Sequence, residues 1–174
     1  MTTGQILSAE MEWLAKVTDS CMRIYFQLEV TNASIEEIVP PAVPADTFYG
    51  TMVKQLSFGE RLVVALALAP YVKPQLLDAF FIENATYHRR FSEFGGMKMQ
   101  QHAGFMPTGE TAIFLLSGSD MDKRIAAMQL LLNGNITGAN GLVQLNAAPG
   151  GEPAACGSLT CRDTFINELL GLNK

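Results

Sequence analysis

The longest periodic pattern in the chain lies near its N-terminus. Mostly apolar residues recur there at alternating steps of four and three, which places them on one face of a helix. The residues of this stripe are Leu7, Met11, Leu14, Thr18, Cys21, Tyr25 and Leu28. The spacing predicts a long first helix over 5–29. A coiled-coil seam is the alternative, but Thr18 and Cys21 suit a seam poorly, so we expect the stripe to pack on a core.

A proline-rich stretch follows this helix. Residues 31–46, TNASIEEIVPPAVPAD, hold three prolines and little periodicity, which indicates an extended connection. The chain therefore divides into a first helix at 1–30, this connection at 31–46 and a helical domain at 47–174. We expect the three parts to form a single globular unit.

Cap and turn signals predict the elements of the region 47–174. Ser57 and Glu60 form a capping box before a helix over 58–69, which is apolar nearly all round and should be central. Pro70 is expected to end it, and Pro74 to open another helix. The further helices are predicted over 74–84, from the cap Thr108 to Leu116 with Gly118 after it, over 120–132 from a Ser119 and Asp122 capping box, and over 161–170 from Thr160 and Asp163.

One stretch in this region carries a strand pattern. ITGANGLVQLNA contains an Asn-Gly turn beside an alternating run, which predicts a hairpin. The fold class predicted is mainly α with a small, late β-hairpin. Short helices followed by a ribbon are the element order of a winged-helix-like domain; a generic helical domain is the alternative.

Composition and charge narrow the classes of function. Hydrophobic residues make up 48% and charged residues 17% of the chain, against about 25% charged in an ordinary domain. Some apolar surface can therefore serve a protein partner. The net charge of -5 leaves no broad basic surface for nucleic acid, and the only cationic cluster is His88, Arg89 and Arg90. We find no membrane span and no signal peptide, and expect a cytoplasmic protein with free thiols.

The stretch 94–116, FGGMKMQQHAGFMPTGETAIFLL, concentrates glycine and proline before an apolar helix. It lacks the G-x-x-x-x-G-K-[ST] pattern of a phosphate loop, because Met99 follows Lys98 where a hydroxyl is required. Glu110 places a carboxylate in the first turn of the predicted helix, where it would repel an anion. We therefore predict no nucleotide and no other cofactor in this chain.

Candidate catalytic and metal-ligating residues are few. Cys156 and Cys161 are separated by four residues without a second close pair, so a zinc site is not predicted. His102 stands between Glu93 and Glu110 in sequence, so a His–carboxylate pair is conceivable. Hydrogen bonds from His102 to backbone carbonyls, which would fix the loop, are the favoured alternative. No catalytic residue is predicted.

The loop 94–110 remains a candidate interaction loop. Its glycines suit positive φ, its aromatics can pin it to the core, and its methionines suit either the core or an adaptable binding surface. The loop therefore serves either as an ordered connection or as a recognition surface. The candidate residues are Phe94, Gly95, Gly96, His102, Gly104, Phe105, Pro107, Thr108, Gly109 and Glu110.

Four stretches resemble a known family. They are LSFGERLVVALALAPYVKPQLLDAFF, FSEFGG, HAGFMPTGETAIFLLSG and GEPAACGSLT, within 56–174. They resemble the N-terminal region of bacterial AAA+ ATPases common in Bacteroidetes, whose genes are often associated with contractile, phage-tail-like injection systems. The resemblance implies a winged-helix-like accessory domain ahead of an ATPase module. No Walker motif occurs up to Lys174, so we expect the N-terminal part of a longer protein or a stand-alone relative.

The hypothesis that follows is a non-catalytic accessory domain. It would bind protein partners, such as the ATPase module or its hexamer, through the loop 94–110 or the first helix. A winged-helix DNA-binding module is the alternative, although the predicted helix 120–132 offers only Lys123 and Arg124 against Asp120 and Asp122. A small hydrolase that uses His102 is the least favoured.

Overall fold

The computed structural model describes residues 1–172. These residues form α-helices, 3-10 turns (η) and short strands. In chain order the elements are α1 (Thr3–Tyr25), η1 (Ile35–Glu37), α2 (Phe48–Val53), α3 (Phe58–Val72), η2 (Asp78–Phe81), β1 (Glu83–Asn84), β2 (Arg89–Arg90), η3 (Ser92–Phe94), α4 (Gly109–Ser117), α5 (Met121–Asn133), β3 (Val143–Leu145), η4 (Ala154–Cys156), β4 (Leu159–Cys161) and α6 (Asp163–Leu169). The strands pair as two small antiparallel sheets, β1–β2 and β3–β4. The predicted mainly α fold class with a small hairpin is confirmed.

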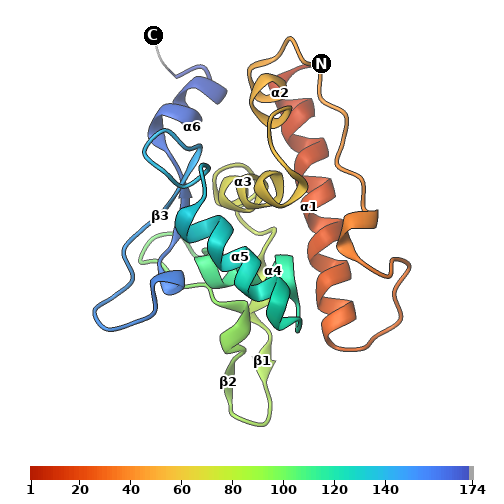
Figure 1. Ribbon diagram of the computed structural model, residues 1–174, viewed down its shortest axis with the longest axis vertical. Helices are drawn as coiled ribbons and strands as arrows, with labels where there is room; N and C mark the ends of the chain where they lie inside the picture. The colour runs from red at the N-terminus through yellow and green to blue at the C-terminus, as the bar shows by residue number, and fades with distance from the viewer. Residues whose placement is uncertain (173–174) are drawn as a thin grey trace.

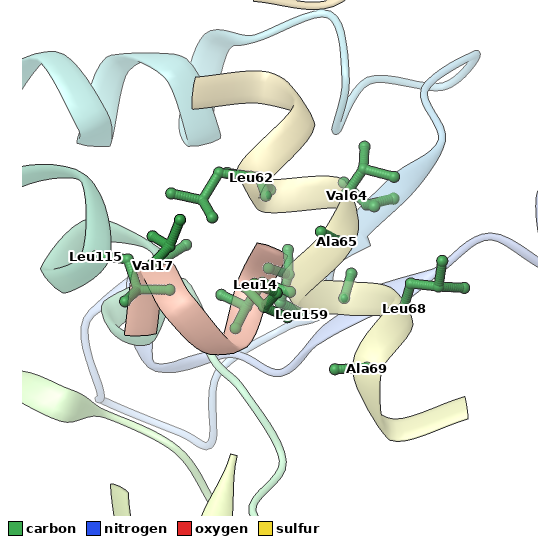
Figure 2. Close-up of a cluster of buried hydrophobic side chains, with 14 of the residues drawn as sticks. Leu14, Val17, Leu62, Val64, Ala65, Leu68, Ala69, Leu115 and Leu159 are labelled. Carbon is green, nitrogen blue, oxygen red and sulfur yellow. The ribbon is translucent and has the colours of Figure 1, made fainter. Parts of the chain in front are cut away.

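Helix α3 forms the centre of the molecule, with α1 alongside it (Figure 1). Its residues from Leu62 to Ala69 are all buried, because it is apolar on every side. Helices α1 and α4 and strand β4 pack against it. Figure 2 shows the resulting cluster, in which Leu14 and Val17 of α1 meet side chains of α3. The Ser57–Glu60 capping box at its start is confirmed.

The predicted stripe of the first helix is buried from Leu7 to Cys21. The helix ends at Tyr25, however, four residues before the predicted end. Gln27 adopts the left-handed conformation with φ 56°, and the Leu28 amide bonds back to the Arg23 carbonyl at 2.8 Å. This is a helix-ending motif that usually uses glycine. Because the chain has glutamine there, no local signal marks the stop.

The segment 74–84, for which the prolines predict a helix, folds differently. It forms turns, η2 and the strand β1, which pairs with β2 in a second hairpin that the sequence pattern does not predict. Leu77 and Phe80 are buried, and the Asp78 carboxylate accepts a hydrogen bond from the Phe105 amide at 3.0 Å. These contacts with the loop outweigh the local helix signal.

Two predicted helix boundaries around prolines and caps are also wrong. Helix α3 continues through Pro70 to Val72, because proline removes only one donor. The helical bonding extends to the cap, where the Lys73 amide donates to the Ala69 carbonyl at 2.8 Å. Helix α5 is capped by Asp120, whose carboxylate accepts from the Lys123 amide at 2.9 Å. The predicted box of Ser119 and Asp122 is therefore displaced by one residue.

The late ribbon has a different partner from the predicted one. Strand β3 pairs with β4, in the register Val143 with Cys161 and Leu145 with Leu159. The Asn140–Gly141 turn lies before β3 and does not join two strands. Because Thr160 and Cys161 belong to β4, the last helix begins at Asp163 rather than at Cys161. Within residues 1–172, no helix combines the length and the apolar character needed to cross a membrane.

Candidate functional site

The loop 94–110 is built on a cluster of phenylalanine rings. Phe94 and Phe105 are both buried, and each contacts Phe80, with ring centroids 5.5 and 5.2 Å apart. Phe94 also packs on Phe114 of α4, at 4.6 Å between centroids. The aromatic residues therefore pin both ends of the loop to the core, as an ordered connection requires.

The two glycines after Phe94 are required by the backbone and by close packing. Gly95 and Gly96 have φ of 59° and 81°, in the region that L-residues rarely adopt. A Cβ at Gly96 would lie 2.0 Å from Cζ of Phe105, and one at Gly95 would lie 2.4 Å from Oγ1 of Thr108. The predicted positive φ is confirmed at both. Gly104 instead allows close approach, since a Cβ there would lie 2.4 Å from the Pro74 carbonyl oxygen.

Hydrogen bonds tie the two ends of the loop together. The Gly96 amide donates to the Thr108 hydroxyl at 3.0 Å, and the Thr111 hydroxyl donates to the Phe94 carbonyl at 2.8 Å. Met97 and Met106 exchange backbone hydrogen bonds at 3.0 and 3.2 Å. The threonine hydroxyls and the Gly96 amide are thus engaged in holding the loop closed.

The loop is also joined to the C-terminal part of the chain. The Leu159 amide donates to the Pro107 carbonyl at 2.9 Å, and the Gly109 amide donates to the Gly157 carbonyl at 3.1 Å. The first amide of α4, that of Gly109, is therefore already bonded to a carbonyl of the chain. Pro107, Thr108 and Gly109 are buried by these contacts.

Glu110 forms an ion pair across two helices. Its carboxylate accepts from both terminal nitrogens of Arg124 in α5, at 3.0 and 2.7 Å. The hydrogen bond to Glu110 raises the pKa of Arg124. Glu110 is thus committed to joining α4 to α5, and Arg124 is not free for a ligand.

His102 does not form the pair that its place in the sequence suggests. The Glu93 carboxylate accepts from the Tyr25 hydroxyl, and this bond, with burial, raises the pKa of Tyr25 to about 12. Glu110 is paired with Arg124. Within the described part of the chain, Nε2 of His102 is buried and has no hydrogen-bond partner. Both expectations are therefore wrong, the carboxylate pair and the bond from this nitrogen to a backbone carbonyl.

The loop borders a surface cavity of about 490 Å³. The cavity gathers Gly95 and Gly96, the start of α4 and the segment around Cys156, so three of the stretches on which the family resemblance depends converge there. The Cys156 thiol is half-buried, and its pKa is raised by burial and by the charges of Glu152 and Glu110. A raised pKa disfavours the thiolate, so Cys156 is poorly suited to act as a nucleophile.

The hairpin β1–β2 lies beside this cavity and carries the cationic cluster. Arg89 and Arg90 form β2, and Arg90 lines both the 490 Å³ cavity and a neighbouring one of about 500 Å³. Lys98, from the loop, lines the second cavity. The guanidinium of Arg90 and the ammonium of Lys98 lie 6.0 and 5.9 Å from the centroid of the Phe81 ring. The sequence signal for this feature is the run His88-Arg89-Arg90, which does not by itself indicate a hairpin.

A second polar cluster centres on the buried Glu10 carboxylate of α1. The Glu10 carboxylate accepts two hydrogen bonds from Arg61, at 2.9 and 2.7 Å, and one from the Tyr49 hydroxyl at 2.9 Å. Arg61 also donates to the Pro41 carbonyl at 2.8 Å. Burial, followed by the Glu10 charge, raises the pKa of Tyr49 well above its usual value. Sequence reasoning missed this cluster, because its members are distant along the chain.

The buried cluster and the cysteines offer no second site within residues 1–172. Every member of the Glu10 cluster is paired, and the cluster fastens the proline-rich connection and α2 to α1 and α3. Cys21 and Cys161 are buried free thiols whose pKa values burial raises to about 12. In the same described residues no group of His, Cys, Asp and Glu side chains is arranged to hold a metal ion.

Comparisons with known protein families, with curated proteins and with solved structures find no match to this chain. The resemblance to the N-terminal region of AAA+ ATPases and the winged-helix-like assignment therefore stay predictions. What the site can do is argued below from its geometry.

Proposed function

We propose that this chain is a non-catalytic accessory domain that binds protein partners for a AAA+ ATPase in the bacterial cytoplasm. One observation carries the proposal. The Gly96 amide, the Thr108 hydroxyl and the Glu110 carboxylate are used to hold the loop 94–110 and helix α4 in place, while the hairpin β1–β2 beside the loop displays cations and the exposed ring of Tyr87. Such a rigid, displayed surface suits recognition better than chemistry.

The DNA-binding alternative has less support from the geometry. It requires basic side chains on α5 that are free to reach a groove. Arg124 is held by Glu110 at 2.7 Å, which leaves Lys123 beside Asp120 and Asp122. A hydrolase has less support as well, because the carboxylates of Glu93 and Glu110 are bonded to Tyr25 and Arg124 rather than to His102.

Site-specific photocrosslinking tests the proposal. A benzophenone amino acid replaces Met99, which is 44% exposed on the rim of the loop, and the whole reading frame is expressed in its own host. We expect crosslinks to a polypeptide that carries an ATPase module with Walker motifs, or within the same chain to such a module. The matched control places the same amino acid at Val39, which is 80% exposed in the connection, and should give no such product.

Two results would overturn the proposal. One is hydrolysis of ATP by the purified chain with a turnover number in the range typical of enzymes, about 1–10³ per second. The other is a crosslinking pattern at position 99 that contains no ATPase module.

A further inference from the structure

The hairpin β1–β2 projects from the helical body at the end of the molecule opposite α6 (Figure 1). Its turn is ordered locally: the Thr86 amide donates to the Asn84 side chain at 3.0 Å, and His88 has a positive φ of 52°. Tyr87 at the tip is 65% exposed, and the Arg89 guanidinium lies 5.3 Å from the centroid of its ring. The hairpin therefore holds an aromatic ring and a cation together in solvent.

The cations of this surface have no anionic partner in the described residues. Among residues 1–172, no carboxylate lies within ion-pair distance of Arg89, Arg90 or Lys98. Nη1 of Arg90 is buried and has no hydrogen-bond partner in the same part of the chain. A buried donor without an acceptor is costly, and the charge of the Arg90 guanidinium is therefore not neutralised within the described residues.

We propose that the cationic hairpin, defined as Tyr87, His88, Arg89 and Arg90 together with Lys98, docks an acidic segment of a partner protein. Carboxylates of that segment would meet the exposed Arg89 and Lys98 and the half-buried Arg90. Nη1 of Arg89 already donates to the Ser92 hydroxyl and to the Arg90 carbonyl, so this guanidinium offers Nε and Nη2 to a carboxylate. This inference rests on the proposed function, whose partner it describes chemically.

Three exposed apolar side chains lie in or beside these segments: Tyr87 in the hairpin, Ile82 directly before β1 and Met99 directly after Lys98. Tyr87, Ile82 and Met99 are 65%, 46% and 44% exposed. A partner segment that alternates acidic and apolar residues could cover both kinds of side chain. The combination of charge and apolar surface is typical of a protein interface, where arginine, aromatic residues and methionine are enriched.

Nucleic acid fits this surface less well. The chain has a net charge of -5, and Glu83 stands opposite Arg90 across the hairpin. The adjoining cavity contains Glu110 and Glu152. A duplex, with one phosphate charge per about 1.7 Å of axis, would extend past the small cationic cluster onto acidic surface. A short acidic peptide segment avoids that repulsion.

Fluorescence anisotropy with defined probes tests the inference on the full chain. The probe is a short fluorescein-labelled peptide in which glutamate alternates with leucine and phenylalanine. We expect it to bind, to bind more weakly as salt rises, and to lose binding when its glutamates are replaced by glutamines. The double substitution Arg89→Gln and Lys98→Gln should weaken binding about tenfold, since each exposed charge contact contributes modestly.

The control variant removes the same charge elsewhere. Lys16→Gln with Lys54→Gln alters two exposed lysines outside the hairpin, and its affinity should stay within about twofold of the original chain. Arg89 and Lys98 are also exposed, so the test variant should keep its melting temperature. Equal affinity of the two variants would overturn the inference. Tighter binding of an oligodeoxythymidine probe would overturn it in favour of nucleic acid.

The two proposals can fail separately. If the peptide binds through the hairpin but position 99 captures no ATPase module, the proposed function fails and the recognition of acidic segments stands. If an ATPase module is captured and the acidic peptide does not bind, the inference fails and the proposed function stands.

Discussion

At the scale of single residues, the most demanding arrangement is the buried carboxylate of Glu10. Its side chain has no exposed surface, and it is balanced by the Arg61 guanidinium at 2.7 Å and the Tyr49 hydroxyl at 2.9 Å. A buried ion pair adds little net stability, because desolvation offsets the attraction. Removing one partner is different, since it leaves the other charge buried and unpaired.

We therefore predict that Arg61→Ala lowers the free energy of unfolding by about 3–5 kcal/mol in urea denaturation. The control is Arg23→Ala, which breaks the ion pair with Asp19 on the surface of α1, where the side chains are 49% and 68% exposed. That loss should be under about 1 kcal/mol. Equal losses in the two variants would contradict the role assigned to Glu10.

A second residue-scale prediction separates backbone strain from steric clash at two glycines. Gly118 has φ 52° and ψ -121°, and a Cβ added there would have no described atom within 4 Å, so Gly118→Ala should cost about 1–3 kcal/mol of stability through backbone strain alone. Gly96→Ala adds the clash with Phe105, and overpacking costs about 1–3 kcal/mol more. Thermal or urea unfolding of both variants measures the difference. Similar costs would show that Phe105 moves aside freely.

At the scale of elements, the helices with strong local signals were predictable from the sequence. The Ser57–Glu60 box and the Gly118 stop each act within about one helical turn, so neighbouring residues were enough to locate the start of α3 and the end of α4. The periodic stripe likewise located α1. Its early end escaped prediction, since Gln27 takes the left-handed position without being glycine.

The elements that were missed depend on contacts between distant residues. Strand β4 lies beside β3 across a long loop, and the Asn146 side chain bridges to Ser158 and Thr160 at 3.0 Å. The hairpin β1–β2 follows a segment that is held by Asp78 against Phe105. In the candidate site, the glycines were predictable from backbone requirements, but the convergence of Arg90, Gly96 and Cys156 on one cavity was not.

The start of α5 supplies the prediction at this scale. Because the Asp120 carboxylate accepts from the Lys123 amide, Asp120→Ala should destabilise the protein by about 1 kcal/mol. Ser119→Ala should change the stability by less than about 0.5 kcal/mol, since this exposed hydroxyl forms no hydrogen bond within residues 1–172. Urea denaturation of the two variants distinguishes them. A larger loss for Ser119→Ala would instead support the cap inferred from the sequence.

At the scale of the whole molecule, charge is distributed unevenly. The chain carries a net charge of -5, yet the cationic hairpin stands at one end, away from α2 and α6 (Figure 1). An acidic partner would therefore be attracted to that end and repelled elsewhere, which favours one orientation of approach. The core also contains ionisable groups, the buried thiols of Cys21 in α1 and Cys161 in β4.

These thiols make the stability of the whole fold sensitive to alkaline pH. Burial raises the pKa of Cys21 and of Cys161 from 9.0 to about 12. Below pH 9 both thiols are protonated in the folded and the unfolded chain, so their contribution is fully present. Between pH 9 and 12 they ionise only in the unfolded chain, which stabilises that state. The free energy of unfolding should therefore fall by up to about 1.4 kcal/mol per pH unit for each thiol.

Urea denaturation at a series of pH values measures this loss. Tyrosines with raised pKa, such as Tyr49 and Tyr71, add to it only above their usual value of 10.0. The double variant Cys21→Ala and Cys161→Ala should consequently lose most of the decline that the original chain shows between about pH 9 and 10, and the small remainder comes from Cys156, whose pKa is also raised. Cys156→Ala is the control, and it should retain most of the early decline because both buried thiols remain. If the free energy of unfolding of the double variant began to fall at the same pH as that of the original chain, the two buried thiols would not be the cause of the loss.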